Sequence, residues 1–184
     1  RDVAYAQIPR VGRARRHRDA AAWIERKAGE RVEDVAQVLA YHYLQALDLA
    51  QAAGEARDVD ELLVPARRFL ALAGERALGL DTAQGEAQLA RALELTPASD
   101  PARSQLLVAW ADAAFQTGRP LQAASALEEA LADLRARSET EAAASALGLR
   151  SRVALRLGES DAVALAGEAV RLLEQRSAGP ALVA

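Results

Sequence analysis

Apolar residues recur every three or four positions along most of this chain, which is the spacing of amphipathic α-helices. The pattern is clearest in residues 103–137, where two such stretches meet at Gly118-Arg119-Pro120. The two predicted stripes are Leu106, Leu107, Trp110, Ala114 and Phe115 in the first helix, and Leu121, Ala124, Leu127, Leu131 and Leu134 in the second. A helical hairpin with one stripe on each helix leaves an apolar edge, so the stretch predicts further helix pairs beside it.

The same periodicity predicts two more helix pairs. They cover about residues 60–78 with 82–95, and about residues 139–157 with 160–175. Successive corners, at Leu80, Gly118 and Gly158, lie 38 and 40 residues apart. A repeat of this length is typical of stacked helical pairs.

Two further helices are expected before these pairs. Pro9 suits the first turn of a helix that runs to about Ala28, on an apolar stripe that includes Ala14, His17 and Ala21. A second helix is predicted over residues 32–53, with Gly54 as its stop. The fold class expected is therefore all-α, with about eight or nine helices and no sheet.

The composition limits how the helices can pack and which kinds of metal or cofactor site the chain can contain. Alanine accounts for 46 of the 184 residues and aromatic residues for 4%, so small side chains must let the helices pack closely. Cysteine is absent, which excludes disulfides and thiolate metal sites. His17 and His42 stand 25 positions apart with no acidic residue at ligand spacing, so we assign them structural roles and expect no metal or cofactor.

No catalytic residue is predicted. The single lysine, Lys27, follows no glycine-rich loop, so a phosphate-binding loop is excluded, and no acid pair or nucleophile with a base converges in the pattern. No run approaches the roughly 18 apolar residues of a membrane span, which predicts a cytoplasmic segment without membrane contact. The chain begins at Arg1 and contains no methionine, which indicates a piece of a longer protein.

Basic residues gather near the start of the chain, where residues 1–31 hold nine Lys or Arg against four Asp or Glu. The segment Arg10–Arg18 contains five arginines, and one hypothesis is that it contacts phosphate or nucleic acid. At 100° per residue, however, these arginines point in different directions around the apolar stripe, and no aromatic residues alternate with them. We favour a solvated helix with one buried face and keep nucleic-acid binding as the alternative.

The central pair resembles a tetratricopeptide repeat in its small residues. Ala111 and Ala123 match the positions where the two helices touch, and Ala73 and Gly85 occupy the same places in the preceding pair. The resemblance implies antiparallel pairs stacked as a right-handed superhelix. It also implies a module that binds a protein, a peptide or an adjacent domain, rather than an enzyme.

The opening of the chain resembles a narrower group. Tyr5, Arg15, His17 and Trp23, with the stretch Leu39–Tyr43, are similar to segments that follow a winged-helix-like or ATPase module in large bacterial signalling proteins. These are class III adenylate or guanylate cyclases with an attached ATPase, and helix-turn-helix transcriptional activators of similar build. The resemblance implies a linker region over residues 1–57, repeats over 58–176 and an exit linker over 177–184. It implies regulation of an ATPase, cyclase or transcription-factor output domain.

The concave face of such a superhelix is lined by the first helix of each pair. If Ala73 and Ala111 are the close-contact positions, the residues that point to this face are Arg67, Leu70, Gly74 and Ala77 in one repeat, and Gln105, Val108, Asp112 and Phe115 in the next. Six of them are predicted to bind the partner: Arg67, Leu70, Gln105, Val108, Asp112 and Phe115. This mixture of charged, amide and apolar side chains suits an extended peptide or a domain loop. The alternative is that the next helix of the chain itself fills the groove.

Overall fold

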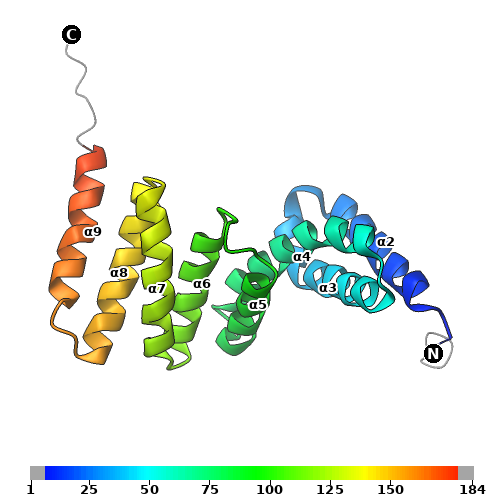
Figure 1. Ribbon diagram of the computed structural model, residues 1–184, viewed down its shortest axis with the longest axis horizontal. Helices are drawn as coiled ribbons and strands as arrows, with labels where there is room; N and C mark the ends of the chain where they lie inside the picture. Colours follow the sequence, from blue (N-terminus) through cyan, green and yellow to red (C-terminus); the bar gives the residue numbers. More distant parts are fainter. Residues whose placement is uncertain (1–6, 178–184) are drawn as a thin grey trace, which may run out of the picture. The chain divides into compact units, whose positions relative to one another are not determined.

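The computed structural model describes residues 7–177, and every element in that range is a helix (Figure 1). In chain order the elements are α2 (Arg10–Ala28), the short 3₁₀ helix η1 (Gly29–Val35), α3 (Ala36–Ala53), α4 (Ala56–Ala77), α5 (Thr82–Glu94), α6 (Arg103–Gln116), α7 (Pro120–Ala136), α8 (Thr140–Leu157) and α9 (Ala162–Ser177). The all-α prediction is confirmed. Among these helices none combines the length and the apolar character needed to cross a membrane.

The helices form two compact units that divide between Thr96 and Pro97. Unit 1 contains α2 to α5 and unit 2 contains α6 to α9, and within each unit successive helices run antiparallel and pack on their neighbours in sequence. The expected boundary between residues 57 and 58 falls inside α4. Tyr5 and residues 178–184 of the expected exit linker lie outside the described residues.

Three helices end at glycines with left-handed backbone, as the sequence predicts for Gly54 and for the corners at Gly118 and Gly158. Their φ angles are 76°, 83° and 74°, a region that glycine enters without the steric cost of a Cβ atom. Pro120 then occupies the first turn of α7, where its missing N–H is no loss. The pairing of helices at residue 118 is therefore confirmed at the level of the backbone.

Two predicted helix starts differ from the structure. The chain forms η1 before α3, so α3 begins at Ala36 and not near residue 32. Conversely, α4 begins at Ala56 and runs through Pro65, although a proline removes one helical hydrogen bond. The helix continues because Leu62 and Phe69, about one turn on either side of the proline, are buried and hold α4 against the unit.

The core of unit 1 joins all of its α-helices. Leu39 and Leu47 on α3, Phe69 on α4 and Leu89 on α5 are completely buried, and Ala21 of α2 is buried as well. The Phe69 ring stacks on Tyr43 with a centroid separation of 5.5 Å and an interplanar angle of 2°. Burial of Ala14 and Ala21 confirms the apolar stripe predicted for the first helix.

Tyr43 also carries a polar link between helices. Its hydroxyl donates a hydrogen bond to Glu25 of α2 at 2.9 Å, and Arg68 of α4 donates to the other oxygen of that carboxylate at 3.1 Å. Burial, followed by the hydrogen bond to Glu25 and the charge of that residue, raises the pKa of Tyr43 to about 12. The folded protein therefore favours the neutral phenol.

Alkaline conditions should weaken unit 1 through this group. The pKa of Tyr43 is raised from an ordinary value of about 10, so its contribution to stability is complete below about pH 10 and is lost as the pH rises through about 12. The loss should reach about 2 to 3 kcal/mol of unfolding free energy. Urea denaturation of the wild type and of Tyr43→Phe over this pH range measures it, and parallel curves for the two proteins would contradict the assignment.

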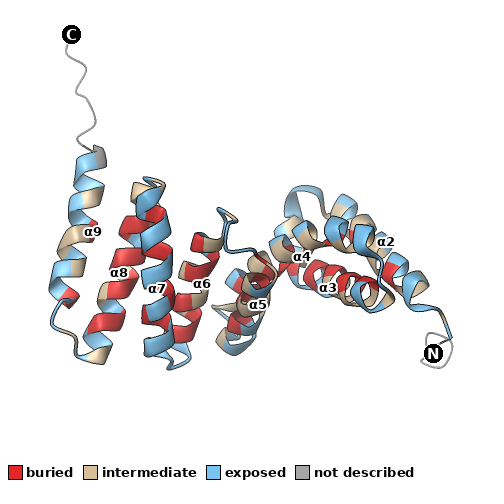
Figure 2. Cartoon of the chain, in the orientation of Figure 1, coloured by how far each residue is buried: buried red, intermediate tan, exposed pale blue. Residues whose placement is uncertain are grey.

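The core of unit 2 is built from leucines and alanines. Leu127 and Leu134 of α7 and Leu147 of α8 are completely buried, and so are the predicted small contacts Ala111 and Ala123. Figure 2 shows buried residues along α6, α7 and α8, while α9 is largely exposed. The stripe prediction was wrong for Leu121, which is 70% exposed because it lies on the outer side of the first turn of α7.

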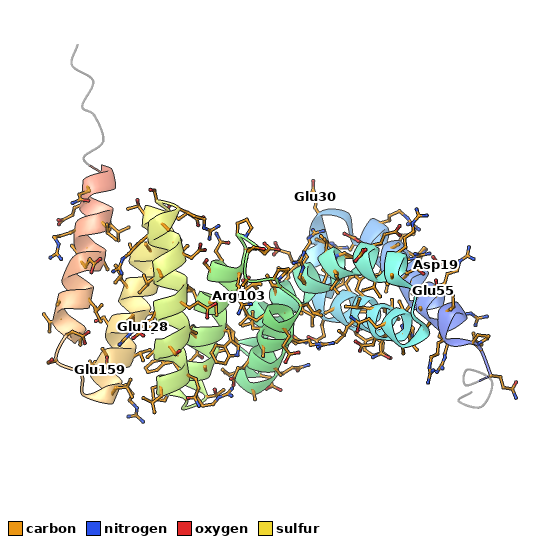
Figure 3. All side chains as sticks on the ribbon, in the orientation of Figure 1. Asp19, Glu30, Glu55, Arg103, Glu128 and Glu159 are labelled. Atoms are coloured by element: carbon orange, nitrogen blue, oxygen red, sulfur yellow. The ribbon has the colours of Figure 1, made fainter. Side chains whose placement is uncertain are left out.

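A buried arginine joins three parts of unit 2. The Arg150 guanidinium on α8 donates to Glu159, just beyond the end of α8, at 2.6 Å and to Glu128 of α7 at 3.3 Å (Figure 3). Only 8% of Arg150 is exposed, so its charge requires these two carboxylates. The three residues fix the end of α8 against α7.

Candidate functional site

The six residues predicted to bind a partner on the concave face fall in different units. Arg67 and Leu70 lie on α4 of unit 1, whereas Gln105, Val108, Asp112 and Phe115 lie together on α6 of unit 2. The four residues of α6 therefore form one part of the predicted site, within unit 2.

Leu70 requires a correction, because only 3% of it is exposed and it belongs to the core of unit 1. Gly74 requires the same correction. It was expected on the open face, but it packs against α5, where an added Cβ would come within 2.7 Å of Leu89 and 3.1 Å of the Gly85 carbonyl oxygen. Leu70 lies one helical turn before Gly74 and so shares the face that α5 covers. Arg67 is half-buried.

On α6 the remaining predicted residues occupy one accessible arc. Gln105 is exposed, and Val108, Asp112 and Phe115 are half-buried. Their spacing of three and four residues places them on a single side of the helix. The opposite side, which includes Leu107, Ala111 and Ala114, is buried in the unit.

An ion pair connects this arc to α8. Arg152 approaches Asp112 at 3.4 Å, and Gln116 donates to the same carboxylate at 2.9 Å. The first helices of two consecutive pairs, α6 and α8, therefore lie close together within unit 2.

The α8 side of this surface is open and partly apolar. Leu155, one turn beyond Arg152, is 76% exposed, and Gly148, one turn before it, has no atom within 4 Å of where a Cβ would stand. We define the α6–α8 face as Gln105, Val108, Asp112 and Phe115 of α6 with Gly148, Arg152 and Leu155 of α8. This face offers one acid, one base and several apolar contacts, a mixture that is typical of protein-binding surfaces.

A separate hollow of about 800 Å³ opens near the start of α8. It is lined by Ser138, Glu139, Thr140, Glu141, Ala142, Ser145 and Gln175. Glu139 in this wall is already paired with Arg137 at 3.2 Å. The lining contains no histidine, cysteine or lysine that could act as a base or nucleophile beside its serines.

The basic segment Arg10–Arg18 lies on α2, and its arginines differ in their surroundings. Arg10, Arg15 and Arg16 are exposed, while Arg18 contacts Asp58 at 3.3 Å and Glu61 at 3.7 Å, both on α4. The acidic start of α4 thus neutralises one of the five charges that a phosphate ligand would require.

The two histidines come together although 25 residues separate them in sequence. His17 of α2 and His42 of α3 place their Nδ1 atoms 3.0 Å apart, and the Tyr41 ring lies edge-on to both imidazoles. Burial lowers the pKa of both histidines, and the neighbouring His42 lowers that of His17 further. Two features of the sequence pointed to this contact. His17 lies in the apolar stripe predicted for the first helix, and His42 lies on the next predicted helix.

In the range 7–177 no group of three or more His, Cys, Asp or Glu residues could hold a metal ion. Comparisons of the chain with protein-family models, with curated proteins and with solved structures find no match. The α6–α8 face and the His17–His42 pair are therefore the features of this fold that point to a function.

Proposed function

We propose that this chain is a non-catalytic interaction module that holds an extended protein segment along the α6–α8 face. The observation that supports this most directly is the Asp112–Arg152 ion pair between the first helices of two consecutive pairs, bordered by the exposed Leu155. In repeats of the tetratricopeptide kind these helices line the concave side of a right-handed superhelix. We extend that arrangement to this chain.

A bound partner can replace the ion pair between Asp112 and Arg152 within the α6–α8 face. The Asp112–Arg152 pair is solvent-accessible, with side chains 32% and 63% exposed, so it contributes at most about 1 kcal/mol. In a complex Asp112 can accept backbone N–H groups, and Arg152 can donate two parallel hydrogen bonds to a carboxylate. Leu155 and Phe115 then bury apolar side chains of the partner, which supplies most of the affinity.

The biological setting is proposed from the resemblance of residues 1–57 to bacterial signalling proteins. In that setting the module couples its partner to an ATPase, cyclase or transcription-factor output domain of a larger chain. Ion pairs join α2 to α4 within unit 1 and α6 to α8 within unit 2.

Two exposed leucines allow a matched test of the binding face. A library of random peptides displayed on phage is selected against the purified protein, and the Kd of each selected peptide is measured by fluorescence polarisation. Leu155→Ala should weaken binding about fivefold to tenfold, because it removes an apolar contact of about 1 kcal/mol or slightly more. Leu121→Ala, which alters an equally exposed leucine on the outer side of α7, should change the Kd less than about twofold.

Equal effects of the two substitutions on every selected peptide would contradict the proposed face. Asp112→Ala combined with Arg152→Ala supplies a second readout, because it removes the polar anchors and leaves the buried core untouched. Binding of short duplex DNA would instead favour the alternative based on Arg10–Arg18. In that case affinity would fall steeply with salt, and Arg15→Ala with Arg16→Ala would remove the dependence.

A further inference from the structure

His17 and His42 meet through their ring nitrogens and not through their faces. Their Nδ1 atoms are 3.0 Å apart, while the ring centroids are 5.1 Å apart and the ring planes are tilted by 46°. Both residues are half-buried. The pair joins α2 to α3 at the edge of unit 1.

A contact of this length requires at least one free nitrogen lone pair. Two protonated Nδ1 atoms at 3.0 Å would repel each other, so one Nδ1–H donates and the other Nδ1 accepts. Neutral imidazole is the form that binds metal ions. An ion bound to both Nδ1 atoms would lie to one side of the line that joins them, and the donating ring would carry its proton on Nε2 instead of Nδ1.

The separation of the nitrogens also matches a chelate. With metal–imidazole bonds of about 2.0 to 2.1 Å, two ligands at a right angle lie about 2.9 Å apart, and two at a tetrahedral angle lie about 3.4 Å apart. The observed 3.0 Å is closer to the right angle. Right angles between ligands are typical of square-planar or tetragonal Cu²⁺ and Ni²⁺, whereas Zn²⁺ favours tetrahedral coordination.

We propose that His17 and His42 form a two-histidine chelate for a divalent transition-metal ion, Cu²⁺ ahead of Ni²⁺ and Zn²⁺, which links α2 to α3. The order of affinities follows from the intrinsic preference of nitrogen ligands for Cu²⁺. No third His, Cys, Asp or Glu completes the site within the described part of the chain, so water occupies the remaining coordination positions. Such an ion stabilises unit 1 because the unfolded chain holds the two histidines 25 positions apart.

The test uses untagged protein that has been freed of metal with a chelator and then dialysed. Isothermal titration with CuCl₂ and with NiCl₂ at neutral pH should show one ion per chain, with the tighter binding for Cu²⁺. His17→Asn and His42→Asn should each weaken binding about tenfold or more. Asparagine keeps a polar group near the Nδ1 position and so preserves the helix contact, which circular dichroism verifies. The melting temperature should rise with metal in the wild type only.

Asp19→Asn is the matched control, because Asp19 is an exposed acid on the same helix (Figure 3), and the two residues that separate it from His17 correspond to about 200° around the helix. It should leave the affinity unchanged, whereas a surface-charge effect would lower it. At substoichiometric Cu²⁺, paramagnetic broadening should remove the ring-proton NMR signals of both histidines. Binding that survives in both asparagine variants, or broadening elsewhere in the protein, would overturn the proposal.

Discussion

Phe69→Ala should lower the unfolding free energy of unit 1 by about 3 to 5 kcal/mol, the largest effect of any single substitution proposed for this chain. The Phe69 side chain is completely buried, stacks on Tyr43 and carries the Arg68 guanidinium 4.8 Å above its ring centroid. Its removal leaves a cavity beside the Tyr43 ring, between α3 and α4. Urea denaturation followed by circular dichroism, with hydrogen exchange of α3 and α4, measures the loss.

The second phenylalanine of the chain provides the matched control. Phe115 is half-buried on α6 of unit 2, so Phe115→Ala should cost roughly half as much or less, and hydrogen exchange in α3 and α4 should not change. If the two substitutions destabilised the protein equally, the ring of Phe69 would not have the central place in the core that the stacking on Tyr43 indicates.

Gly85→Ala and Gly148→Ala should change stability in opposite directions, although both add one methyl group to a helix. At Gly85 of α5 the new Cβ would lie 2.8 Å from the Gly74 carbonyl oxygen and 3.1 Å from the Leu78 backbone nitrogen. Backbone atoms must move to relieve these contacts, so the expected cost is about 1 to 3 kcal/mol. At Gly148 of α8 nothing lies within 4 Å, and alanine should stabilise by about 0.5 to 1 kcal/mol.

Thermal unfolding of the two variants, compared with the wild type, separates these outcomes by sign. A gain in stability at Gly85 would mean that α4 and α5 are not in close contact at Gly74. A loss at Gly148 would mean that its side of α8 is covered. Gly148 also belongs to the α6–α8 face. The Kd of selected peptides for Gly148→Ala therefore shows whether a partner occupies the open space beside this residue.

Features set by short stretches of sequence could be predicted. The ends of α3, α6 and α8 follow from glycine at Gly54, Gly118 and Gly158, where only the local backbone conformation matters. The burial of the small residues Ala111 and Ala123 was expected from the resemblance of this pair to a tetratricopeptide repeat. The start of α4 could not be read in the same way, because packing of Leu62 and Phe69 outweighs the local effect of Pro65.

Contacts between side chains of two different helices could not be predicted from the sequence pattern. Leu70 was placed on the surface because Ala73, and not Gly74, was taken as the close contact, and a shift of one residue turns a helix by about 100°. The His17–His42 contact and the Arg150 pairs with Glu128 and Glu159 depend on how neighbouring helices are rotated. Periodicity identifies which side of a helix is apolar but does not fix that rotation.

The packing of each helix on its neighbours in sequence has a consequence for synthesis of the chain. Domains with mainly local contacts fold in microseconds to milliseconds. A helix pair of about 40 residues leaves a ribosome over roughly 2 to 8 s, so each pair has time to dock before the next one emerges. α6 and α7 can therefore reach their final packing while α8 is still being translated, and the edge they expose meanwhile is made largely of alanine and leucine from α7.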